Sequence, residues 1–442
     1  MILTPVQFGA IGDGIADDTT SLQNAVNTLA KGDTLDLIGK VYRTSSPITI
    51  TNKTDFLILG YGSIIKTIDS TPVTANKQLL YISDCTRFRI EGVVIDGNRS
   101  TRIPAEVAAH NVQFRRCRDF ILTQVSSINS VVDGFYFGAA NNTDPTTYCS
   151  DFKLINCYAD NCYRQGASVI NAYNFEFDGG SYTNTKGTAP EAGIDVESNP
   201  GATLSNKNGV FKNILFKGNN GVGLLLSNVG APRNFSVENC EFISNTLGGI
   251  NCSSSDVVIE GCAFSDHQDT AVGGVVFMSG QPTHGTRIAN CTFDNNNTIA
   301  IQTHSLTDGT IIFGNTINTN LGIGIKSRGN NNIISNNYIS DCTDIGILSA
   351  GETCTIQNNY ITRVNGRGIY TDGLGAKVIN NTIRNVNNPL GAYMQVKGEY
   401  SYLHGNICIA TNKTEMPHTR VEGLHVQELD GRAINLNRTQ KI

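Results

Sequence analysis

From residue 134 onward, the chain repeats a short segment in which a small residue is followed by alternating apolar and polar positions. The small residue acts as an anchor and recurs at steps of 22 to 32 residues. Alternation with a period of two is typical of strands that bury one face. Repetition in this range indicates a solenoid, in which equivalent positions of successive repeats stack. The anchors are Gly134, Gly166, Gly193, Gly223, Gly249, Gly274, Ala300, Gly324, Gly346, Gly368 and Gly391.

A second pattern lies between the anchors and includes a column of Asn and Cys residues. Stacked Asn side chains hydrogen-bond along a ladder, and Asn tolerates the left-handed backbone of a sharp corner. Two or three strands per turn with tight corners predict an all-β fold, a right-handed parallel β-helix, whose handedness follows the general rule for parallel crossovers. The column contains Cys240, Cys262, Cys291, Asn315, Asn337, Asn359 and Asn381, the last four at intervals of 22 residues.

The N-terminal residues form a different module. After a Gly-rich turn, Asp17 or Asp18 is placed to cap a short helix in which Leu22, Ala25 and Val26 recur at helical spacing. We expect this helix to cover the open end of the sheet stack, because an exposed strand edge invites aggregation. The expected domains are an N-terminal motif and capping helix over 1–32, a β-helix over 33–412, and a C-terminal cap or subunit-contact segment over 413–442.

Composition and charge narrow the function classes. The formal net charge is -5 and no run of basic residues is present, so we expect no nucleic-acid partner. No stretch is long and apolar enough for membrane insertion, and the start has no secretory signal. Of the 12 Cys, Cys157 joins the corner column and Cys252 falls on an inward strand position. We interpret the cysteines as buried apolar residues rather than disulfides, which suits a protein made in a reducing cytosol.

The N-terminal motif and the repeats together resemble the pectate-lyase-like superfamily of right-handed parallel β-helix proteins. The motif reads Val6-Gln-Phe-Gly-Ala-Ile-Gly-Asp-Gly-Ile-Ala-Asp-Asp-Thr and is followed by Leu22-Gln-Asn-Ala. That superfamily includes polygalacturonases, polysaccharide lyases, epimerases and bacteriophage tailspike depolymerases, and the chain is closest in character to the last group. The resemblance implies a polysaccharide substrate, a homotrimer, and a phage virion tail component that acts at the bacterial cell surface.

One repeat places two carboxylates on the outward face of its strand. Asp195 and Glu197 are two residues apart, which sets their Cα atoms ~6.6 Å apart. Because two like charges this close disfavour joint ionisation, one pKa should rise. That arrangement suits a general acid paired with a nucleophile or base, in either the retaining or the inverting geometry. The pair also fits a Ca²⁺ site or a plain solvated strand. We assign no metal site and expect no other cofactor.

Further residues are expected to contact the substrate. Glu191 and Arg164 each precede an anchor by two residues, which makes them neighbours on adjacent coils, ~4.8 Å apart. They form either an ion pair or a substrate contact that tunes the acids. Tyr136, Tyr370 and Tyr393 are predicted on the same outward face, where exposed aromatic rings stack on sugars.

A basic cluster lies further along the chain. His304, Lys326 and Arg328 fall on outward positions, and Gly324-Ile-Lys-Ser-Arg resembles the basic strand of polygalacturonases and some lyases. Lys326 is five coil steps from Asp195, ~24 Å away, so the two cannot act on one bond within one chain. They would serve as subsites of a long groove or meet between subunits. His267 and His284 are expected to be ordinary surface residues in loops.

Three hypotheses follow. The first is a trimeric glycoside hydrolase that cleaves a bacterial capsular or exopolysaccharide with Asp195 and Glu197. The second is a polysaccharide lyase that removes a proton beside a uronate carboxyl, using the region of Lys326, Arg328 and His304. The third is a glycan-binding solenoid without chemistry.

Overall fold

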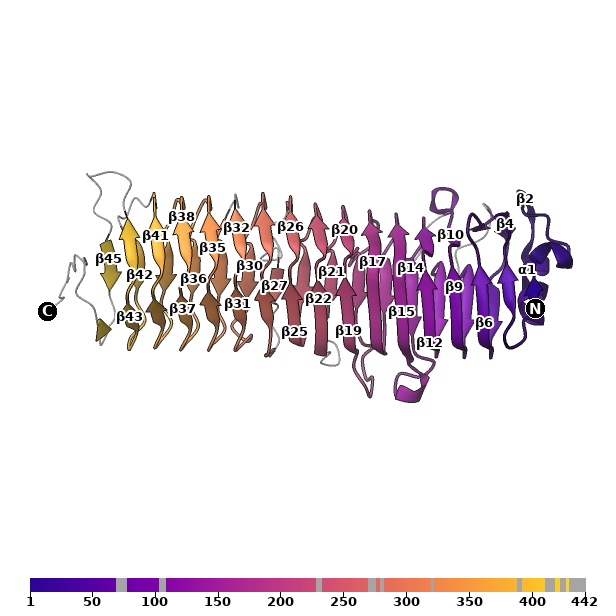
Figure 1. The fold of residues 1–442 in the computed structure, drawn as a ribbon, viewed down its shortest axis with the longest axis horizontal. Coiled ribbons are helices and arrows are strands. Elements are labelled where there is room, and N and C mark those ends of the chain that lie inside the picture. Colours follow the sequence, from indigo (N-terminus) through magenta and orange to yellow (C-terminus); the bar gives the residue numbers. More distant parts are fainter. Residues whose placement is uncertain are drawn as a thin grey trace. The chain divides into compact units, whose positions relative to one another are not determined.

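The computed structural model is built of parallel strands that stack coil upon coil (Figure 1). They fall into two units, Met1–Ser236 and Val237–Ile442. The predicted all-β solenoid is therefore confirmed. The structure describes residues 1–68, 78–102, 109–227, 233–268, 276–278, 282–318, 322–387, 392–409, 418–421 and 427–428.

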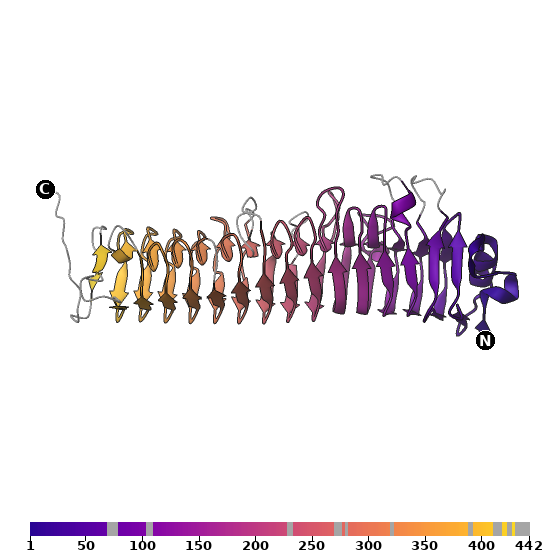
Figure 2. The same ribbon diagram turned by 90° about the horizontal axis from the view of Figure 1, so that it is seen from above.

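The N-terminal motif folds into the predicted helix. Helix α1 (Thr19–Thr28) buries Leu22, Ala25 and Val26 and packs on the 3-10 helix η1 (Pro5–Phe8). It lies at the N-terminal end of the first unit (Figure 2).

The two candidate capping residues of α1 have different roles. Asp18 occupies the N-cap position, but its carboxylate accepts hydrogen bonds from the backbone N–H groups of Ile11 and Gly12 at 2.7 and 3.1 Å. Asp17 accepts from the N–H of Thr19 at 3.1 Å. Asp18 thus holds the Gly-rich turn against the helix without a side-chain cap bond, and Asp17 bonds the N–H of the first helical residue.

The strands of the first unit stack into three parallel rows. Row 1 holds β1 (Ile2–Leu3), β3 (Thr34–Asp36), β6 (Thr54–Leu59), β9 (Thr86–Glu91), β12 (Arg118–Thr123) and β19 (Lys207–Lys212). Row 2 holds β2 (Asp13–Asp17), β4 (Val41–Thr44), β7 (Ile64–Thr67), β10 (Val94–Asp96), β13 (Ser126–Ile128) and β20 (Leu215–Lys217). Row 3 holds β5 (Ile48–Thr51), β8 (Leu80–Ser83), β11 (Val112–Arg115), β14 (Asp133–Gly138), β16 (Gln165–Val169), β18 (Ile194–Val196) and β21 (Leu224–Leu226).

Two long strands and several short elements complete this unit. The strands β15 (Cys149–Asp160) and β17 (Ala172–Thr183) each span rows 1 and 2. The 3-10 helices η2 (Arg99–Thr101) and η3 (Pro145–Thr147) lie in loops. The strand β22 (Arg233–Glu238) crosses the boundary between the units.

The second unit repeats the three-row pattern. Row 1 holds β25 (Ser255–Glu260), β28 (Arg287–Ala289), β31 (Ile311–Phe313), β34 (Ile333–Ser335), β37 (Thr355–Gln357), β40 (Lys377–Ile379), β43 (Tyr402–His404) and β46 (Gln427–Glu428). Row 2 holds β23 (Glu241–Ile243), β26 (Ala263–Ser265), β29 (Thr292–Asp294), β32 (Thr316–Asn318), β35 (Tyr338–Ser340), β38 (Tyr360–Thr362), β41 (Thr382–Arg384) and β44 (Ile407–Ile409). Row 3 holds β24 (Ile250–Cys252), β27 (Val276–Met278), β30 (Ile301–Thr303), β33 (Ile325–Ser327), β36 (Ile347–Ser349), β39 (Ile369–Thr371), β42 (Ala392–Val396) and β45 (His418–Val421).

Aromatic stacks fill the core of both units. In the first unit, the ring of Phe88 lies 5.0 Å from that of Phe56 and 4.8 Å from that of Phe120. In the second, the ring of Phe264 lies 4.8 Å from that of Phe242 and 4.7 Å from that of Phe293. Equivalent inward positions of successive coils are one strand spacing apart, so identical side chains meet face to face.

The predicted Asn ladder is present in the second unit. Asn315 donates from its backbone N–H and from Nδ2 to Oδ1 of Asn337, both at 3.0 Å. Asn337 donates in the same way to Asn359. The expectation that the ladder residues also adopt the left-handed conformation is wrong, because that conformation belongs to the preceding residues, such as Asn336 and Asn358 at φ 56°. In each pair of adjacent Asn residues, the first therefore turns the chain at the corner and the second forms the hydrogen-bonded ladder.

Two strands of row 3 depart from the predicted register. Counting from the anchor Gly274 predicts Val276 and Met278 on the outward face of β27. That prediction is wrong, because both are buried and the outward residue paired with Asn251 is Phe277. On β42 the residue paired with Tyr370 is Gln395, and Tyr393, which was predicted to be exposed, is buried. On β27 the shift is one residue, which exchanges the two faces of a strand. On β42 Met394 takes the place expected for Ala392, a shift of two residues that does not exchange the faces, so Tyr393 is buried for another reason. The anchors chosen for these strands, Gly274 and Gly391, lie outside the described residues.

The cysteine prediction is confirmed. All 12 are free thiols, and all except Cys408 are buried. In the C-terminal segment 413–442, β45 and β46 add parallel strands to β42 and β43, and the remainder of that segment lies outside the described residues. The domain boundaries at 32 and 412 stay predictions.

Candidate active site

The predicted carboxylate pair lies at β18 in row 3 of the first unit. The register places Asp195 between Ser168 of β16 and Leu225 of β21. Its neighbours on the strand, Ile194 and Val196, are fully buried in the core. Asp195 lies on the opposite face, as predicted, yet it is only 3% exposed. The outward face of the coil is therefore covered at this point.

Asp195 has a fixed hydrogen-bond partner for one of its two carboxyl oxygens. The Nε2 atom of Gln165 donates to Oδ2 at 2.8 Å. The Oε1 atom of Gln165 accepts from the N–H of Ala192 at 3.1 Å. Because a backbone N–H can only donate, this contact sets the orientation of the amide. The Oδ1 atom of Asp195 is buried and has no hydrogen-bond partner.

The surroundings of Asp195 favour its protonated form. Burial raises the pKa of Asp195 well above its usual value, the carboxylates of Glu197 and Asp133 raise it further, and Arg164 opposes the shift. The group therefore keeps its proton at a pH where an exposed Asp is ionised. Because Oδ2 accepts the amide of Gln165, Oδ1 is the oxygen left free to carry the proton. A protonated, buried carboxyl is what a general acid requires.

Glu197 follows directly after β18 and is half-buried. Its backbone N–H donates to the carbonyl oxygen of Val169 at 3.1 Å, so the chain stays in register with the preceding coil. No ion pair involves Glu197 in the part of the chain that the structure describes. It is the more accessible member of the pair, which suits a nucleophile or base.

A buried ion pair lies beside Asp195. Asp133 of β14 is fully buried and accepts from Nε and Nη2 of Arg164 at 2.8 and 2.5 Å. The hydroxyl of Ser168 donates to Asp133 at 2.9 Å. The Nδ1 atom of His110 lies 3.0 Å from Oδ2 of Asp133, without the alignment of a hydrogen bond. Burial opposes ionisation of Asp133, but Arg164 and then His110 outweigh it and lower its pKa.

The predicted ion pair between Glu191 and Arg164 is wrong. Arg164 pairs with Asp133, while Glu191 accepts from the N–H of Gly187 at 2.6 Å and from Nδ2 of Asn220 at 2.5 Å. Glu191 also has a left-handed backbone, with φ 54°. This turn departs from strand geometry, so the spacing of extended strands does not apply to its side chain.

Tyr136 borders the same region but is half-buried rather than exposed. Its ring stacks on that of His110, with the centroids 4.3 Å apart and the planes at 17°. Burial raises the pKa of its hydroxyl, and Asp133 adds to the effect. One ring face is thus already occupied by His110 and is not open to a sugar.

Loops beside the carboxylate pair are tied together. Oδ1 of Asn142, in the loop after β14, accepts from Nδ2 of Asn171 at 2.8 Å and from Nδ2 of Asn199 at 3.1 Å. Asn199 follows Glu197 by two residues. These contacts join three consecutive coils at the end of row 3, so the backbone after Glu197 is held in place.

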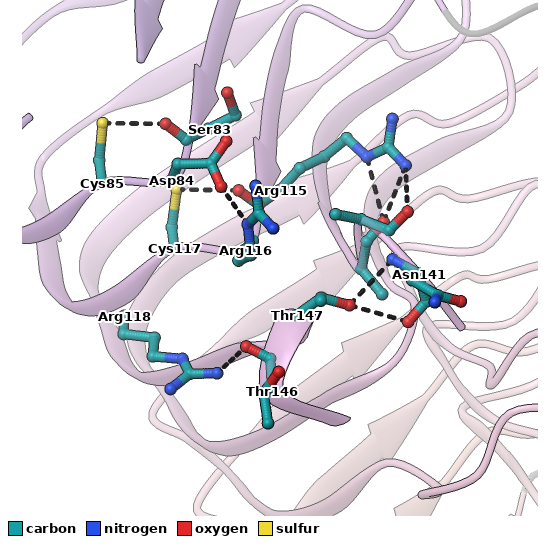
Figure 3. A network of polar contacts seen from close by, with 12 residues as sticks. Ser83, Asp84, Cys85, Arg115, Arg116, Cys117, Arg118, Asn141, Thr146 and Thr147 are labelled. Atoms are coloured by element: carbon teal, nitrogen blue, oxygen red, sulfur yellow. Dashed lines mark hydrogen bonds and ion pairs between the residues drawn. The ribbon is translucent and has the colours of Figure 1, made fainter. Parts of the chain in front are cut away.

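The base of the same loop is fixed by arginines, as Figure 3 shows. Arg115 donates from Nε and Nη2 to the carbonyl oxygen of Ala139 at 3.1 and 3.0 Å, and Arg118 donates to that of Thr146. The hydroxyl of Thr147 donates to the carbonyl oxygen of Asn141 at 2.8 Å. The loop that reaches toward Glu197 therefore starts from a rigid corner.

The basic cluster belongs to row 3 of the second unit. Lys326 pairs in register with Gln302 and Leu348. Burial lowers the pKa of Lys326, and Arg328 lowers it further. Arg328 is exposed and His304 is half-buried. The structure thus places Asp195, Glu197, Arg164, Glu191 and Tyr136 in the first unit, and His304, Lys326 and Arg328 in the second.

The two remaining histidines behave differently from each other. His284 is exposed, as predicted. His267 is fully buried, so its assignment to the surface is wrong. Its Nδ1 atom lies 3.0 Å from the carbonyl oxygen of Asn245, and burial lowers its pKa. His267 lies just after a row 2 strand, and its side chain faces the core. Its neighbours in the sequence are polar, so the sequence pattern does not indicate this burial.

Sequence reasoning missed Asp133, Gln165 and His110. Asp133 and Gln165 each stand directly before an anchor glycine and pair with each other in register. The signal that could have found both is a polar column at the position directly before each anchor, one residue closer to the anchor than Arg164 and Glu191. His110 lies in a long insertion between β10 and β11, and no repeat pattern marks it.

The described residues hold no group of three or more His, Cys, Asp or Glu side chains arranged to bind a metal ion. Among these same residues, no helix has the length and apolar character needed to cross a membrane.

Comparison with known proteins identifies the family. A sequence model described as "Right handed beta helix region" matches residues 145–307 and 274–415, together more than half of the chain. The chain belongs to this right-handed β-helix family. The predicted handedness of the β-helix agrees with that description, and the resemblance to β-helix proteins of the tailspike type is confirmed at the level of the fold.

Two curated relatives match short segments of the chain. A capsule K30/K69-specific depolymerase of Klebsiella phage K64-1 is 44% identical over 69 residues, which cover 14% of this chain and 9% of the relative. Mannuronan C5-epimerase AlgE5 of Azotobacter vinelandii is 34% identical over 104 residues, which cover 21% of this chain and 10% of the relative. The chain thus spans about a tenth of the length of these curated relatives.

Solved structures share the fold. Pre-mature gene product 12 of bacteriophage phi29 has a TM-score of 0.67 at 14% identity, covering 96% of this chain and 57% of that chain. ORF18 of Geobacillus virus E2 has a TM-score of 0.54 at 16% identity, covering 72% of this chain and 61% of that one.

Proposed function

We propose that this β-helix is a glycoside hydrolase, a depolymerase of the tailspike type that cleaves a bacterial capsular or exopolysaccharide. The observation that supports this proposal is the contrast between two neighbouring carboxyls. Asp195 is buried, has a raised pKa and has an unpartnered Oδ1 atom, whereas Glu197, two residues later, is half-buried. Different environments separate the roles of two acids in glycosidases.

The proposed step moves one proton and breaks one bond. Asp195 donates the proton on Oδ1 to the glycosidic oxygen as the C–O bond to the anomeric carbon breaks. Glu197 attacks that carbon, or activates a water that does so, and the proton balance is restored when water has been added. The resulting Asp195 carboxylate is stabilised by the amide of Gln165 and the charge of Arg164. Because Oδ1 is buried, a neighbouring side chain must move when the glycan binds.

The similarity of segments of the chain to a phage capsule depolymerase and to a mannuronan epimerase supports a polysaccharide substrate. The phage relative also supports our proposal that the protein is a virion tail component acting at the cell surface. From the resemblance to tailspikes we further propose a homotrimer. Light scattering during gel filtration tests the assembly, since a mass equal to one or two chains contradicts it.

A panel of bacterial polysaccharides, with products identified by mass spectrometry, tests the reaction. Fragments that carry an added water support a hydrolase. Asp195→Asn and Glu197→Gln should each reduce cleavage at least ~100-fold, as loss of a catalytic acid or base does. Asp178→Asn, a carboxylate of the same unit that pairs with Lys212 at 3.4 Å, serves as the control.

Other products would contradict the proposal. Fragments lighter by one water, with an unsaturated uronate at the new end, indicate a lyase and direct attention to Lys326, Arg328 and His304. Binding of a polysaccharide without fragments indicates a glycan-binding solenoid. Loss of cleavage in the presence of EDTA, restored by Ca²⁺, would assign the carboxylate pair to a cation instead.

A further inference from the structure

Arg164 is held in one orientation by its partner. Its Nε and Nη2 atoms donate to the two oxygens of Asp133 at 2.8 and 2.5 Å. This bidentate pair uses one edge of the planar guanidinium and fixes its plane. Asp133 is itself fully buried and bonded by the hydroxyl of Ser168. The guanidinium therefore cannot turn without breaking a buried ion pair.

The opposite edge of the same guanidinium is open. The side chain of Arg164 is 33% exposed. Its Nη1 atom makes no hydrogen bond within the described residues and is not among the buried polar atoms that lack a partner. An arginine has five N–H donors, so this edge offers donors with the spacing of a carboxylate.

Neighbouring acids do not use the open edge. Asp195 is close enough to interact electrostatically with Arg164 but favours its protonated form. Glu191, the predicted partner, is bonded to Gly187 and Asn220. Among the described residues, no carboxylate bonds the open N–H groups of Arg164. These charged donors are therefore available to a ligand.

We propose that the open edge of Arg164 binds a carboxylate of the sugar at the cleavage site, so that the substrate is an acidic polysaccharide. This inference rests on the proposed function, because it takes Asp195 as the acid that protonates the glycosidic oxygen. Two parallel N–H···O bonds from a fixed guanidinium orient a carboxylate strongly. Arg164 is then a specificity-determining residue, and Asp133 is the residue that positions it.

The test compares two forms of the polysaccharide that the wild-type protein cleaves. One is the native polymer, and the other is the same polymer after carbodiimide activation and borohydride reduction of its carboxylates to alcohols. For each protein, the ratio of kcat/KM for the native form to that for the reduced form is measured. Wild type should favour the native form about 10- to 100-fold, the range for charge-assisted hydrogen bonds.

The variants separate recognition from folding. Arg164→Gln alone removes the main counter-ion of the buried Asp133, so the double variant Arg164→Gln/Asp133→Asn is the informative one. It should bring the ratio near one. Arg89→Gln, an exposed arginine of the same unit that pairs with Glu91, should keep the wild-type ratio.

Several outcomes overturn the proposal. They are a cleaved substrate that has no carboxylate, a ratio near one in the wild type, and a wild-type ratio in the double variant. A dependence on sulfate groups instead, shown by chemical desulfation, also overturns it. The proposed hydrolysis is tested by a different result, the identity of the products. Unsaturated products, or no products, contradict hydrolysis whatever the kcat/KM ratio is.

Discussion

At the scale of single residues, the notable feature of the site is that Asp195 is buried, where its ionised form is disfavoured. Asp195 is buried beside Leu225 and has one hydrogen-bond donor for two oxygens. A structural role would be served as well by an apolar residue of similar size. The proposed acid chemistry explains why a carboxyl is useful there, since a proton must be retained at a pH where exposed acids lose it.

This burial predicts an unusual dependence of stability on pH. Because the pKa of Asp195 is higher in the folded than in the unfolded chain, its stabilising contribution is complete below the unfolded pKa and is lost as pH rises through the folded pKa. Asp195→Asn removes this dependence. The variant should be at least as stable as wild type at neutral pH, measured by urea denaturation between pH 4 and 8. A less stable variant at pH 8 would show that the ionised form is accommodated.

A second prediction concerns the pH profile of cleavage. The charge of Asp133 raises the pKa of Asp195, whereas that of Arg164 lowers it. Asp133→Asn removes the first influence and leaves the second, so the pKa of Asp195 should fall. The alkaline limb of the pH profile of kcat/KM should therefore move to lower pH. Asp178→Asn is the control, and an unchanged limb in Asp133→Asn would exclude Asp195 as the group that titrates.

At the scale of elements, the corner between rows 1 and 2 combines two adjacent Asn residues with different tasks. Asn337 is buried, accepts two hydrogen bonds from Asn315 and donates to the carbonyl oxygen of Ile312 at 3.1 Å. Asn336 is exposed and has φ 56°. The first residue satisfies backbone groups, and the second only turns the chain.

This division gives a matched pair of variants. Asn337→Ala leaves buried groups without partners and should lower the free energy of unfolding by about 2–4 kcal/mol. Asn336→Gly should change it by less than about 0.5 kcal/mol, since Gly adopts positive φ without strain. Urea denaturation followed by circular dichroism measures both. Equal effects would show that the ladder contributes no more than the turn.

Register is also decided at this scale, and it shows where pattern reasoning fails. Row 3 positions follow from regular anchors in most coils. The second residues after Gly134, Gly166, Gly193 and Gly223 pair in register, as equal spacing from the anchors predicts; they are Tyr136, Ser168, Asp195 and Leu225. On β27 the anchor was placed one residue early, and both faces were exchanged. Loops of variable length precede row 3, and a glycine in such a loop looks like an anchor until the strand pairing is known.

At the scale of the whole molecule, the reactivity of the cysteines measures how well the core is protected, because buried cysteines occur from Cys85 to Cys354. Burial raises the pKa of Cys149, Cys157 and Cys252 to about 12, and the thiolate is the reactive form. In the native protein at pH 8, DTNB should therefore react quickly with Cys408 at most. After denaturation it should titrate all 12 thiols. Rapid reaction of several native thiols would show that coils open readily.

The solenoid, the inward and outward faces of most strands, the capping helix, the Asn ladder and the carboxylate pair can all be predicted from the amino-acid sequence. These follow from local alternation and a steady repeat length, which are properties of consecutive residues. The folded chain adds that Asp195 is covered, that Gln165 orients it, and that Arg164 pairs with Asp133 and not with Glu191. Those contacts depend on how far each loop shifts one coil relative to the next. They cannot be predicted from the repeat length, because the repeat length does not specify that shift.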